Sequence, residues 1–498
     1  MSAIVSRIER HPEMHRLKDK RLLRELGYID GRWVSTLQGA VFEVRDPGAS
    51  ALVGNVAKLG DVEADLAVSA ASTAFAKWSG LLPQERAGFL RAWYNQIVAA
   101  REDLALILSL EQGKPLAEAL GEIDYGASFV EWCAEEAKRT NVETVSSHLR
   151  DAELLVHRVP LGVAAIVTPW NFPNAMLARK AAAALAAGCT TVCNPSPFTP
   201  LSALALAELA DRAGLPAGVF NVVPGDSKTI VERWIDDARV RIVSFTGSTQ
   251  VGRSIYARCG ATMKRMVMEL GGHAPLIVFA DSDIDKAVDV AVNAKFATSG
   301  QDCLAANRIF VQRPIYEKFC QLFAARVRQL RVGYCLDADV DIGPLMHKAS
   351  LDKVRAQVRD AQLHGARTLV GQTEFVENEL YFPPTVLTDV SDDASIMHEE
   401  TFGPVAVVNP FDSEEEAVGR ANNTEYGLAA YVLTKDLARS FRVGRALQFG
   451  MVAINRVKLT GAPIPFGGFK QSGLGKEGSQ HGVEEFTDIQ YICIDTAA

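Results

Sequence analysis

The sequence predicts an α/β protein with two mostly parallel sheets covered by helices. Three observations support this fold class. Short β-rich segments alternate with helical segments from about residue 156 onward, a second such series starts at Ala274, and residues 60–140 have a helical pattern throughout. Apolar strands separated by amphipathic helices need crossover connections, and these produce parallel sheets buried on both faces.

The length and charge of the chain limit its class. Its 498 residues suffice for two large domains, or three at about 150 residues each. Lys and Arg total 52 against 60 Asp and Glu, and these basic residues are scattered, so no nucleic-acid partner is expected. No apolar run approaches the ~20 residues that span a bilayer.

The N-terminal residues and the cysteines indicate the cellular compartment. Residues 1–20 lack the apolar core of a secretion signal. The eight cysteines are too sparse for a disulfide framework and none forms a CxxC pair, so neither disulfides nor a metal site are predicted. We therefore expect a soluble, cytoplasmic protein.

The helical region comes first along the chain. Apolar residues recur every three or four positions, which predicts helices over residues 61–78, 82–109 and 115–138. The first α/β series follows, and glycines at 188 and 214 end two of its helices in the left-handed conformation. Its strand and helix pairs are 163–168 with 174–187, 190–193 with 201–213, 219–223 with 229–236, and 241–245 with 249–259.

The second series starts after residues 266–272, where the chain is expected to cross between the two units. Its elements are a strand at 274–279, a helix at 283–297, a strand at 308–311 and a helix at 316–330. Two extended segments, 154–159 and 486–494, belong to neither series. The second of them alternates partly like an edge strand, and an open edge favours pairing with another copy, so we expect an oligomer.

Two glycine-rich segments resemble phosphate-binding loops. Residues 473–478 spell GLGKEG, but only twenty residues follow, too few for the dinucleotide unit, so this segment is interpreted as a turn. Residues 247–254 nearly spell a Walker A loop with Arg253 in place of Lys. They follow a strand and open a helix, which suits a pyrophosphate, although an ordinary helix cap explains them equally well.

Cys303 and Glu269 are the candidate reactive groups. Cys303 lies in a polar, glycine-containing break between a helix and a strand, whereas the other cysteines lie in apolar runs or helix faces. Cys303 is therefore the best candidate nucleophile. Glu269 ends an apolar strand, and it is either a buried base or a solvated strand end; taken alone, the solvated interpretation is favoured.

Six motifs occur in the order and spacing of the aldehyde dehydrogenase superfamily, which the chain resembles over residues 30–495. They are TPWNFP (168–173), FTGST (245–249), MELGG (268–272), GQDC (300–303), EETFGP (399–404) and PFGGFK (465–470). The resemblance implies two doubly wound α/β domains and a small β oligomerisation element. It assigns residues 1–142 and 161–270 to an NAD(P)-binding domain, 271–468 to a catalytic domain, and 143–160 and 469–498 to the oligomerisation element of a homodimer or homotetramer.

The resemblance also implies the roles of individual residues. Cys303 is the nucleophile, Glu269 the general base, and Asn171 with the Cys303 backbone N–H forms the oxyanion hole; Lys180 lies near the active site and the cofactor. The implied cofactor contacts are Gly247 and Ser248 for the pyrophosphate, Glu400 for the nicotinamide ribose and Phe402 for the nicotinamide ring. Four further residues are implied to bind the cofactor: Thr168, Pro169, Trp170 and Asn194.

Within the superfamily the chain resembles the succinate-semialdehyde dehydrogenases, through residues 131–139, 170–181, 269–275 and 475–478. That branch holds the distal carboxylate of the substrate with two arginines and a hydroxyl. Arg179 matches the first arginine and Thr460 stands near the hydroxyl position, but Ala297 replaces the second arginine. The expected substrate is therefore succinate semialdehyde, bound weakly, or another small acidic or hydroxylated aldehyde. For Arg179, a surface or interdomain ion pair is the alternative.

The cofactor segment departs from the family as well. Asn194 and Pro197 stand where the family has a Lys and a Glu for the adenosine ribose, and Lys228 is a possible substitute. Without the Lys, the 2′-phosphate of NADP⁺ loses a cationic partner, which disfavours NADP⁺. Without the Glu, the repulsion of that phosphate also disappears, which favours NADP⁺. NAD⁺ is therefore preferred only slightly over NADP⁺. These departures leave an alternative: a family member with impaired dinucleotide binding that acts as a binding, scaffold or thioesterase-like protein.

Overall fold

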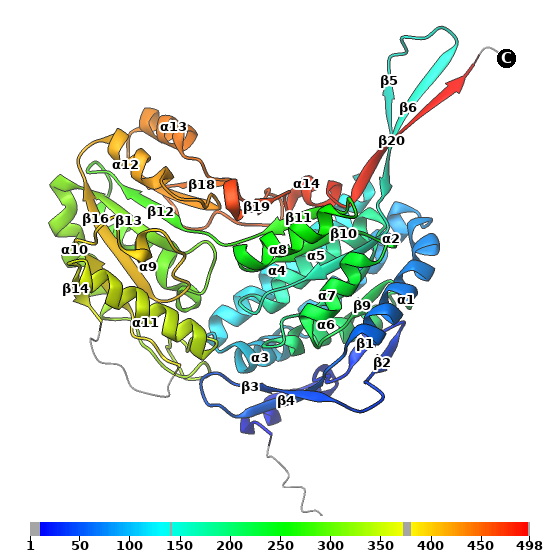
Figure 1. Cartoon of the computed structure of the whole chain (residues 1–498), viewed down its shortest axis with the longest axis horizontal. Helices are drawn as coiled ribbons and strands as arrows, with labels where there is room; N and C mark the ends of the chain where they lie inside the picture. Colours follow the sequence, from blue (N-terminus) through cyan, green and yellow to red (C-terminus); the bar gives the residue numbers. More distant parts are fainter. Residues whose placement is uncertain (1–9, 140–141, 372–379, 497–498) are drawn as a thin grey trace, which may run out of the picture.

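The computed structural model describes residues 10–139, 142–371 and 380–496. Two α/β units lie side by side, and a β arm projects away from the first unit (Figure 1). The chain crosses between the units at residues 270–273, as the sequence predicted, because residues 265–269 pair in the first sheet and 274–278 in the second.

The first unit contains an eight-stranded sheet whose five central strands are parallel. In spatial order its strands are β19 (Gly473–Leu474), β11 (Arg265–Glu269), β10 (Val240–Thr246), β7 (Val163–Val167), β8 (Thr190–Asn194), β9 (Phe220–Val222), β1 (Gly27–Ile29) and β2 (Arg32–Val34). A separate hairpin pairs β3 (Val41–Arg45) with β4 (Leu52–Ala57). The glycine-rich segment at 473–478 consists of the short antiparallel strand β19 and the turn that follows it, so the interpretation of this segment as a turn and not as a dinucleotide fingerprint is confirmed.

The helices of the first unit agree with the predicted ones except at one point and except for α14, which the sequence did not predict. They are α1 (Asp61–Ser79), α2 (Pro83–Ala99), α3 (Arg101–Gln112), α4 (Leu116–Glu136), α5 (Pro173–Ala187), α6 (Pro200–Arg212), α7 (Ser227–Asp236), α8 (Thr249–Gly260) and α14 (Ser479–Glu484). The single helix predicted over residues 82–109 is wrong, because Ala100 leaves the helical conformation and separates α2 from α3. The apolar spacing continues across the break, so periodicity alone does not reveal it.

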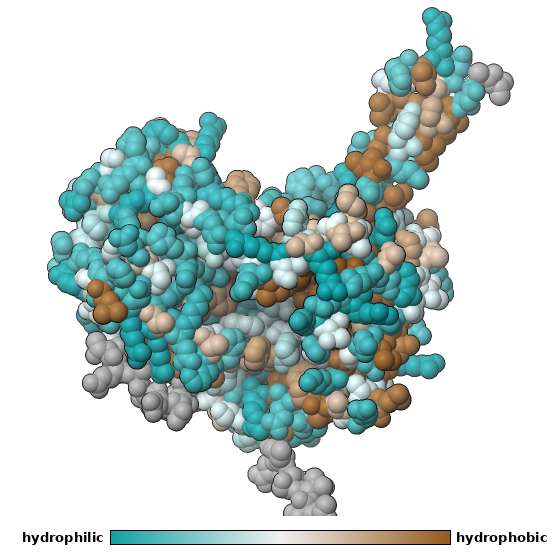
Figure 2. Space-filling model, in the orientation of Figure 1, coloured by the Kyte–Doolittle hydropathy of each residue, from teal (hydrophilic) through white to brown (hydrophobic). Residues whose placement is uncertain are grey.

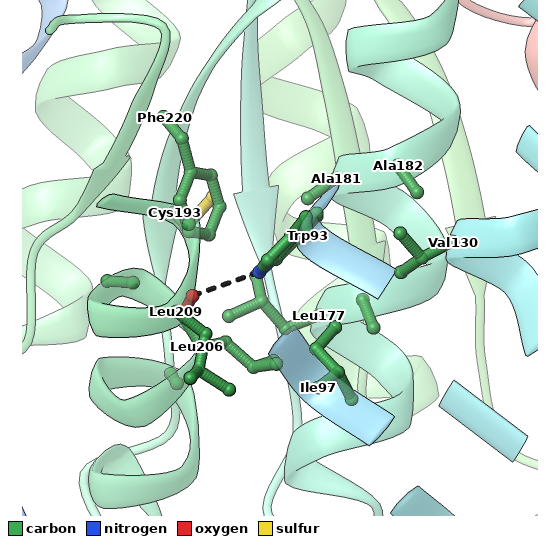
Figure 3. Packing of buried hydrophobic residues seen from close by; sticks show 14 of the residues in the cluster. Trp93, Ile97, Val130, Leu177, Ala181, Ala182, Cys193, Leu206, Leu209 and Phe220 are labelled. Carbon is green, nitrogen blue, oxygen red and sulfur yellow. Dashed lines mark hydrogen bonds between the residues drawn. The ribbon is translucent and has the colours of Figure 1, made fainter. Parts of the chain in front are cut away.

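The core of this unit determines where α5 lies. Trp93 of α2 packs against Phe220 with ring centroids 5.3 Å apart, and its indole N–H donates to the Leu206 carbonyl of α6 at 3.1 Å (Figure 3). Every residue of α5 is buried, which its many alanines permit, because small side chains let neighbouring helices approach closely. Arg179 and Lys180 lie on this helix and are therefore held in the interior.

The second unit contains a seven-stranded sheet, mostly parallel, with helices on both faces. Its strands, in spatial order, are β14 (Arg367–Val370), β15 (Thr385–Thr388), β16 (Val405–Phe411), β13 (Ala306–Gln312), β12 (Ala274–Val278), β17 (Ala429–Leu433) and β18 (Met451–Ile454). Its helices are α9 (Ile284–Phe296), α10 (Arg313–Val327), α11 (Lys348–Leu363), α12 (Glu414–Asn422) and α13 (Leu437–Ala446). Two clusters of buried apolar side chains line the two faces of this sheet.

The arm is a three-stranded antiparallel sheet of β20 (Thr487–Asp495), β6 (Ala152–Pro160) and β5 (Glu143–Val145). The two extended segments predicted outside the α/β series are thus paired with each other. β20 is an edge strand, and Ile489 and Tyr491 on it are 63% and 54% exposed, which contributes to the apolar surface along the arm (Figure 2). Oligomerisation through this arm stays a prediction. Among the described residues, no helix combines the length and apolar character needed to cross a membrane.

Candidate active site

A cavity of about 560 Å³ lies between the two α/β units. It is at the carboxyl ends of β7 and β10, the edge at which open α/β sheets usually bind ligands. The predicted site residues that line it are Pro169, Trp170, Asn171, Arg179, Gly247, Ser248, Cys303, Glu400, Phe402 and Thr460. The other predicted residues, Thr168, Lys180, Asn194 and Glu269, are buried outside this lining.

The loop that carries Cys303 is held in place by two close backbone contacts. A Cβ added to Gly272 would come within 2.1 Å of the Cys303 carbonyl oxygen. One added to Gly300 would come within 2.3 Å of the Gly403 carbonyl oxygen, and Gly300 has a positive φ of 70°. Only glycine fits at these two positions, which explains the glycines at the end of MELGG and at the start of GQDC.

The surroundings of the Cys303 thiol favour its neutral form. Burial raises its pKa well above the usual value, and the nearby carboxyl groups of Asp302, Glu400 and Glu269 raise it further. Arg179 acts in the opposite direction. The thiol therefore keeps its proton at neutral pH, and it must lose that proton before it can attack an aldehyde.

Glu269 lies at the end of β11, only 1% exposed, and neither of its carboxylate oxygens has a hydrogen-bond partner. The solvated strand end that its sequence context favoured is therefore wrong. The chain folds back over it: Gly473 of β19 pairs with Glu269, and a Cβ on Gly467 of the PFGGFK motif would lie 3.0 Å from Glu269 Oε1. Burial, and then the charge of Glu477, raise the pKa of Glu269 well above its usual value.

Arg179 and Lys180 both form ion pairs with Glu477, a residue of the glycine-rich turn. Lys180 also donates to Ser244 Oγ at 3.1 Å. Despite its burial, Glu477 has a lowered pKa because these two cations lie beside it. The negative charge of the cluster is therefore favoured on Glu477 over Glu269.

Arg179 is not part of a surface ion pair, since it is only 1% exposed. One Nη donates to Met176 Sδ at 3.0 Å, and the guanidinium lies over the ring of Phe466 at 4.4 Å. Its Nε and Nη1 have no hydrogen-bond partner. Buried unpaired donors are costly, so these two groups indicate an acceptor from a ligand in the cavity.

Asn171 is hydrogen-bonded to the loop that carries Cys303. Its side-chain Nδ2 donates to the Gln301 backbone carbonyl at 3.0 Å. Its backbone carbonyl accepts a hydrogen bond from Lys114 Nζ at 2.8 Å. A primary amide has two N–H groups, so one remains for an oxygen in the cavity. This arrangement is compatible with the oxyanion role that the resemblance implies.

The other half of the cavity fits a dinucleotide. Gly247 and Ser248 precede α8, whose free N–H groups and positive end face it. A Cβ on Gly247 would lie 2.5 Å from the Phe245 ring, so only glycine leaves this loop unperturbed. Thr246 Oγ1, on the same loop, is buried without a partner.

Glu400 and two aromatic rings complete that half. Glu400 accepts a hydrogen bond from the Gly272 N–H at 2.9 Å, and burial raises its pKa to about 7. Phe402 packs edge-on against Trp170 with centroids 5.5 Å apart. Phe402 has φ +53°, an unusual conformation for an aromatic residue that turns this loop into the cavity.

The segment assigned to the adenosine ribose lies apart from this cavity. Asn194 is buried and its Nδ2 donates to the Val223 carbonyl at 2.8 Å. Only its Oδ1 lacks a partner. Pro197 and Lys228 are both exposed.

The comparisons with known proteins agree with this geometry. The aldehyde dehydrogenase family model matches residues 33–492, so the chain belongs to the aldehyde dehydrogenase family. It is 48% identical to a non-phosphorylating aspartate-semialdehyde dehydrogenase of Halomonas elongata, over 96% of this chain and 97% of that protein. It is 46% identical to the NADP⁺ succinate-semialdehyde dehydrogenase of Escherichia coli strain K12, over 96% and 99%. The crystal structure of an aldehyde dehydrogenase from Brucella melitensis biovar abortus 2308 superposes with a TM-score of 0.95 at 46% identity, over 97% and 99%.

Six charged residues of the site are not among those that the sequence indicates. Glu477 lies in the glycine-rich turn at 473–478. Glu118, Glu122, Asp302, Lys353 and Lys458 line the cavity. The position of Asp302 beside the nucleophile is the one signal that is visible in the sequence. The other five reach the site from distant segments, and only the fold brings them there.

Proposed function

We propose that the protein oxidises a small acidic semialdehyde to the free carboxylic acid, with NAD⁺ or NADP⁺ as electron acceptor. One arrangement carries this proposal: Cys303 and a buried guanidinium with free N–H groups, Arg179, line one cavity, with the unpaired carboxyl of Glu269 buried beside it. The Cys303 thiol suits attack on an aldehyde, the Arg179 guanidinium suits a carboxylate, and the Glu269 carboxyl suits the activation of water.

The chain's own groups account for the acylation step. The Cys303 thiol releases its proton to solvent water, and its sulfur then attacks the aldehyde carbon, so the carbonyl oxygen becomes negative. The free N–H of Asn171 and the Cys303 backbone N–H stabilise that oxygen. The bound nicotinamide supplies the acceptor for the hydride that the adduct must lose.

Glu269 and water account for the release of the acid. A carboxyl group with a raised pKa is a stronger base once ionised than an ordinary one, and its burial beside the catalytic loop suits proton removal from water. The water attacks the thioester, and the acid departs while the Cys303 sulfur takes back a proton.

Arg179 is the proposed contact for the distal carboxylate of the substrate, with the Thr460 hydroxyl beside it. Lys458 lines the same cavity two residues earlier and forms no ion pair within the part of the chain that the structure describes. Lys458 is the proposed replacement for the second arginine, at whose position this chain has Ala297. The relatives named for aspartate and succinate semialdehydes make four-carbon acids the first candidates.

For the nucleotide we favour NAD⁺, because Asn194 supplies no cation for a 2′-phosphate and its amide nitrogen is already used. The Escherichia coli relative is named for NADP⁺, so both nucleotides belong in the assay. The arm is the proposed contact between copies in a homo-oligomer.

The test is the rate of absorbance increase at 340 nm with succinate semialdehyde and related acidic aldehydes, with each nucleotide in turn. We expect a rate that Cys303→Ala lowers by about 10⁴-fold or more, because the covalent route is lost. Equal rates in both proteins, or no reduction of either nucleotide with any acidic aldehyde, would refute the proposal. The second result would leave a binding protein without dehydrogenase activity.

A further inference from the structure

Lys295 is a buried cation to which the proposed reaction gives no role. It lies in the last turn of α9 and is 0% exposed. Its Nζ donates to Asn307 Oδ1 of β13 at 2.8 Å. A lysine buried against a neutral amide is costly to desolvate, so further interactions of its charge are expected.

Asn307 extends this contact toward the active site. It is 2% exposed, and its Nδ2 donates to the Gly272 carbonyl at 3.5 Å, a long hydrogen bond. Gly272 belongs to the segment in which the chain crosses between the two units. The Asn307 amide therefore connects Lys295 to the backbone of that segment.

Gly272 connects this backbone to Glu400. Its N–H donates to Glu400 Oε1 at 2.9 Å, and Glu400 lines the nucleotide half of the cavity. Gly272 also packs against the Cys303 carbonyl, but the loop that carries Cys303 has a second close contact at Gly300. A displacement of Gly272 is therefore expected to move Glu400 more than the Cys303 loop.

The charge of Lys295 acts on Glu400 as well. Burial lowers the pKa of Lys295 to about 7, and the carboxylates of Glu400 and Asp302 oppose this decrease. Burial raises the pKa of Glu400 to about 7, and the charges of Lys353 and Lys295 oppose that increase. Lys295 thus favours the ionised form of Glu400, whose oxygens act only as acceptors, as ribose hydroxyl donors require.

We propose that Lys295 is a positioning residue for the nucleotide, which acts through Asn307 and the Gly272 peptide on the carboxylate of Glu400. This rests on the proposed function, in which the nucleotide lies against Glu400. Lys295 does not line the cavity, so it reaches the nucleotide only through these groups and through its charge. Two observations agree on Glu400 as its target: the series of hydrogen bonds ends there, and the charges of the two residues attract each other.

The test measures the Kd for NAD⁺ and for NADP⁺ by isothermal titration calorimetry on the whole chain, without aldehyde. Lys295→Met keeps an unbranched side chain of similar length and removes both the charge and the donor. We expect Kd to rise about tenfold, because Glu400 is held less well and is ionised less readily. The KM for the aldehyde at saturating nucleotide should change much less.

A double-mutant cycle with Glu400→Ala separates positioning from a general structural role. If Lys295 acts through Glu400, adding Lys295→Met to Glu400→Ala should change Kd less than about twofold. A structural role would instead raise Kd by the same factor in both backgrounds. Asn307→Ala breaks the series in its middle and should also raise Kd, so the proposal stays testable if Lys295→Met does not fold.

Lys286→Met is the matched control, because Lys286 lies on the same helix and is exposed. Its Kd should equal that of the unmodified protein. An unchanged Kd in Lys295→Met or Asn307→Ala, or a full additional rise in the Glu400→Ala background, would overturn the proposal. If the nucleotide binds but no acidic aldehyde is oxidised in a Cys303-dependent reaction, the proposed function fails, and the Kd values still decide the role of Lys295. If neither nucleotide binds to the unmodified protein, both fail.

Discussion

The two halves of the cavity are built differently. The nucleotide half is formed largely by backbone, with Gly247 and Ser248 before α8 and the Gly271–Gly272 segment beside Glu400. The aldehyde half is formed by side chains from separate segments, among them Glu118 and Arg179. Binding in the nucleotide half therefore depends on backbone conformation, and binding in the aldehyde half depends on charged side chains.

The two halves of the cavity therefore differ in the substitutions that they tolerate. A backbone cradle needs glycine at fixed places, so it appears as a contiguous motif and tolerates few substitutions. A charged side-chain pocket can change its ligand through one residue. The aldehyde half is therefore where this chain is expected to differ from its relatives in specificity.

Removing the guanidinium should produce the largest change within the aldehyde half. Arg179→Met should lower kcat/KM for an acidic semialdehyde roughly 10- to 100-fold, because a charge-assisted contact of about 1.5–3 kcal/mol is lost. Steady-state kinetics measure this effect. Butanal, which has no distal carboxylate, is the control substrate, and an equal loss with butanal would mean that Arg179 acts only on structure.

A change in the nucleotide half should affect the other substrate. Gly247→Ala places a Cβ 2.5 Å from the Phe245 ring, so the loop must shift and the KM for the nucleotide should rise about tenfold. The KM for the aldehyde should change much less. Gly260→Ala, at the far end of α8 with no atom within 4 Å of its added Cβ, is the matched control. Equal effects on both KM values would contradict the separation of the two halves.

The smallest expected effect is on the pH profile of the nucleophile. Asp302→Asn removes a negative charge that raises the Cys303 pKa, so the midpoint of alkylation by iodoacetamide should move about one pH unit lower. The alkylation rate is measured against pH in a Cys493→Ala background, since Cys493 is exposed. A midpoint that stays in place or moves higher would show that Asp302 does not influence the thiol.

The order of the elements was predictable because it depends on local patterns. The strands and helices at 163–259 and 274–330 follow from apolar spacing, and Gly188 ends α5 as expected, whereas β14–β18 and α11–α13 were not predicted. The break at Ala100 was not predictable from periodicity. Ala100 has φ −96° and ψ 10°, a local departure from helical geometry that apolar spacing does not encode.

The site was predictable where its residues lie in motifs, and less so where burial decides the chemistry. Cys303 was identifiable from its loop, but the burial of Glu269 depends on the turn at 473–478, two hundred residues away. Glu477 lies in that same turn, so its ion pairs with Arg179 and Lys180 are also invisible in the sequence. Charge states in this cluster are properties of the fold.

The central claim is that Cys303 carries the acyl group and Glu269 promotes its release. Its most direct test is the intact mass of Glu269→Gln after mixing with an acidic semialdehyde and nucleotide. The account predicts that the acyl adduct accumulates on Cys303, and that higher pH does not restore its hydrolysis as it does in the unmodified enzyme, where Glu269 must lose a proton to act as the base. Release of free acid at the unmodified rate, or an adduct on a residue other than Cys303, would contradict it.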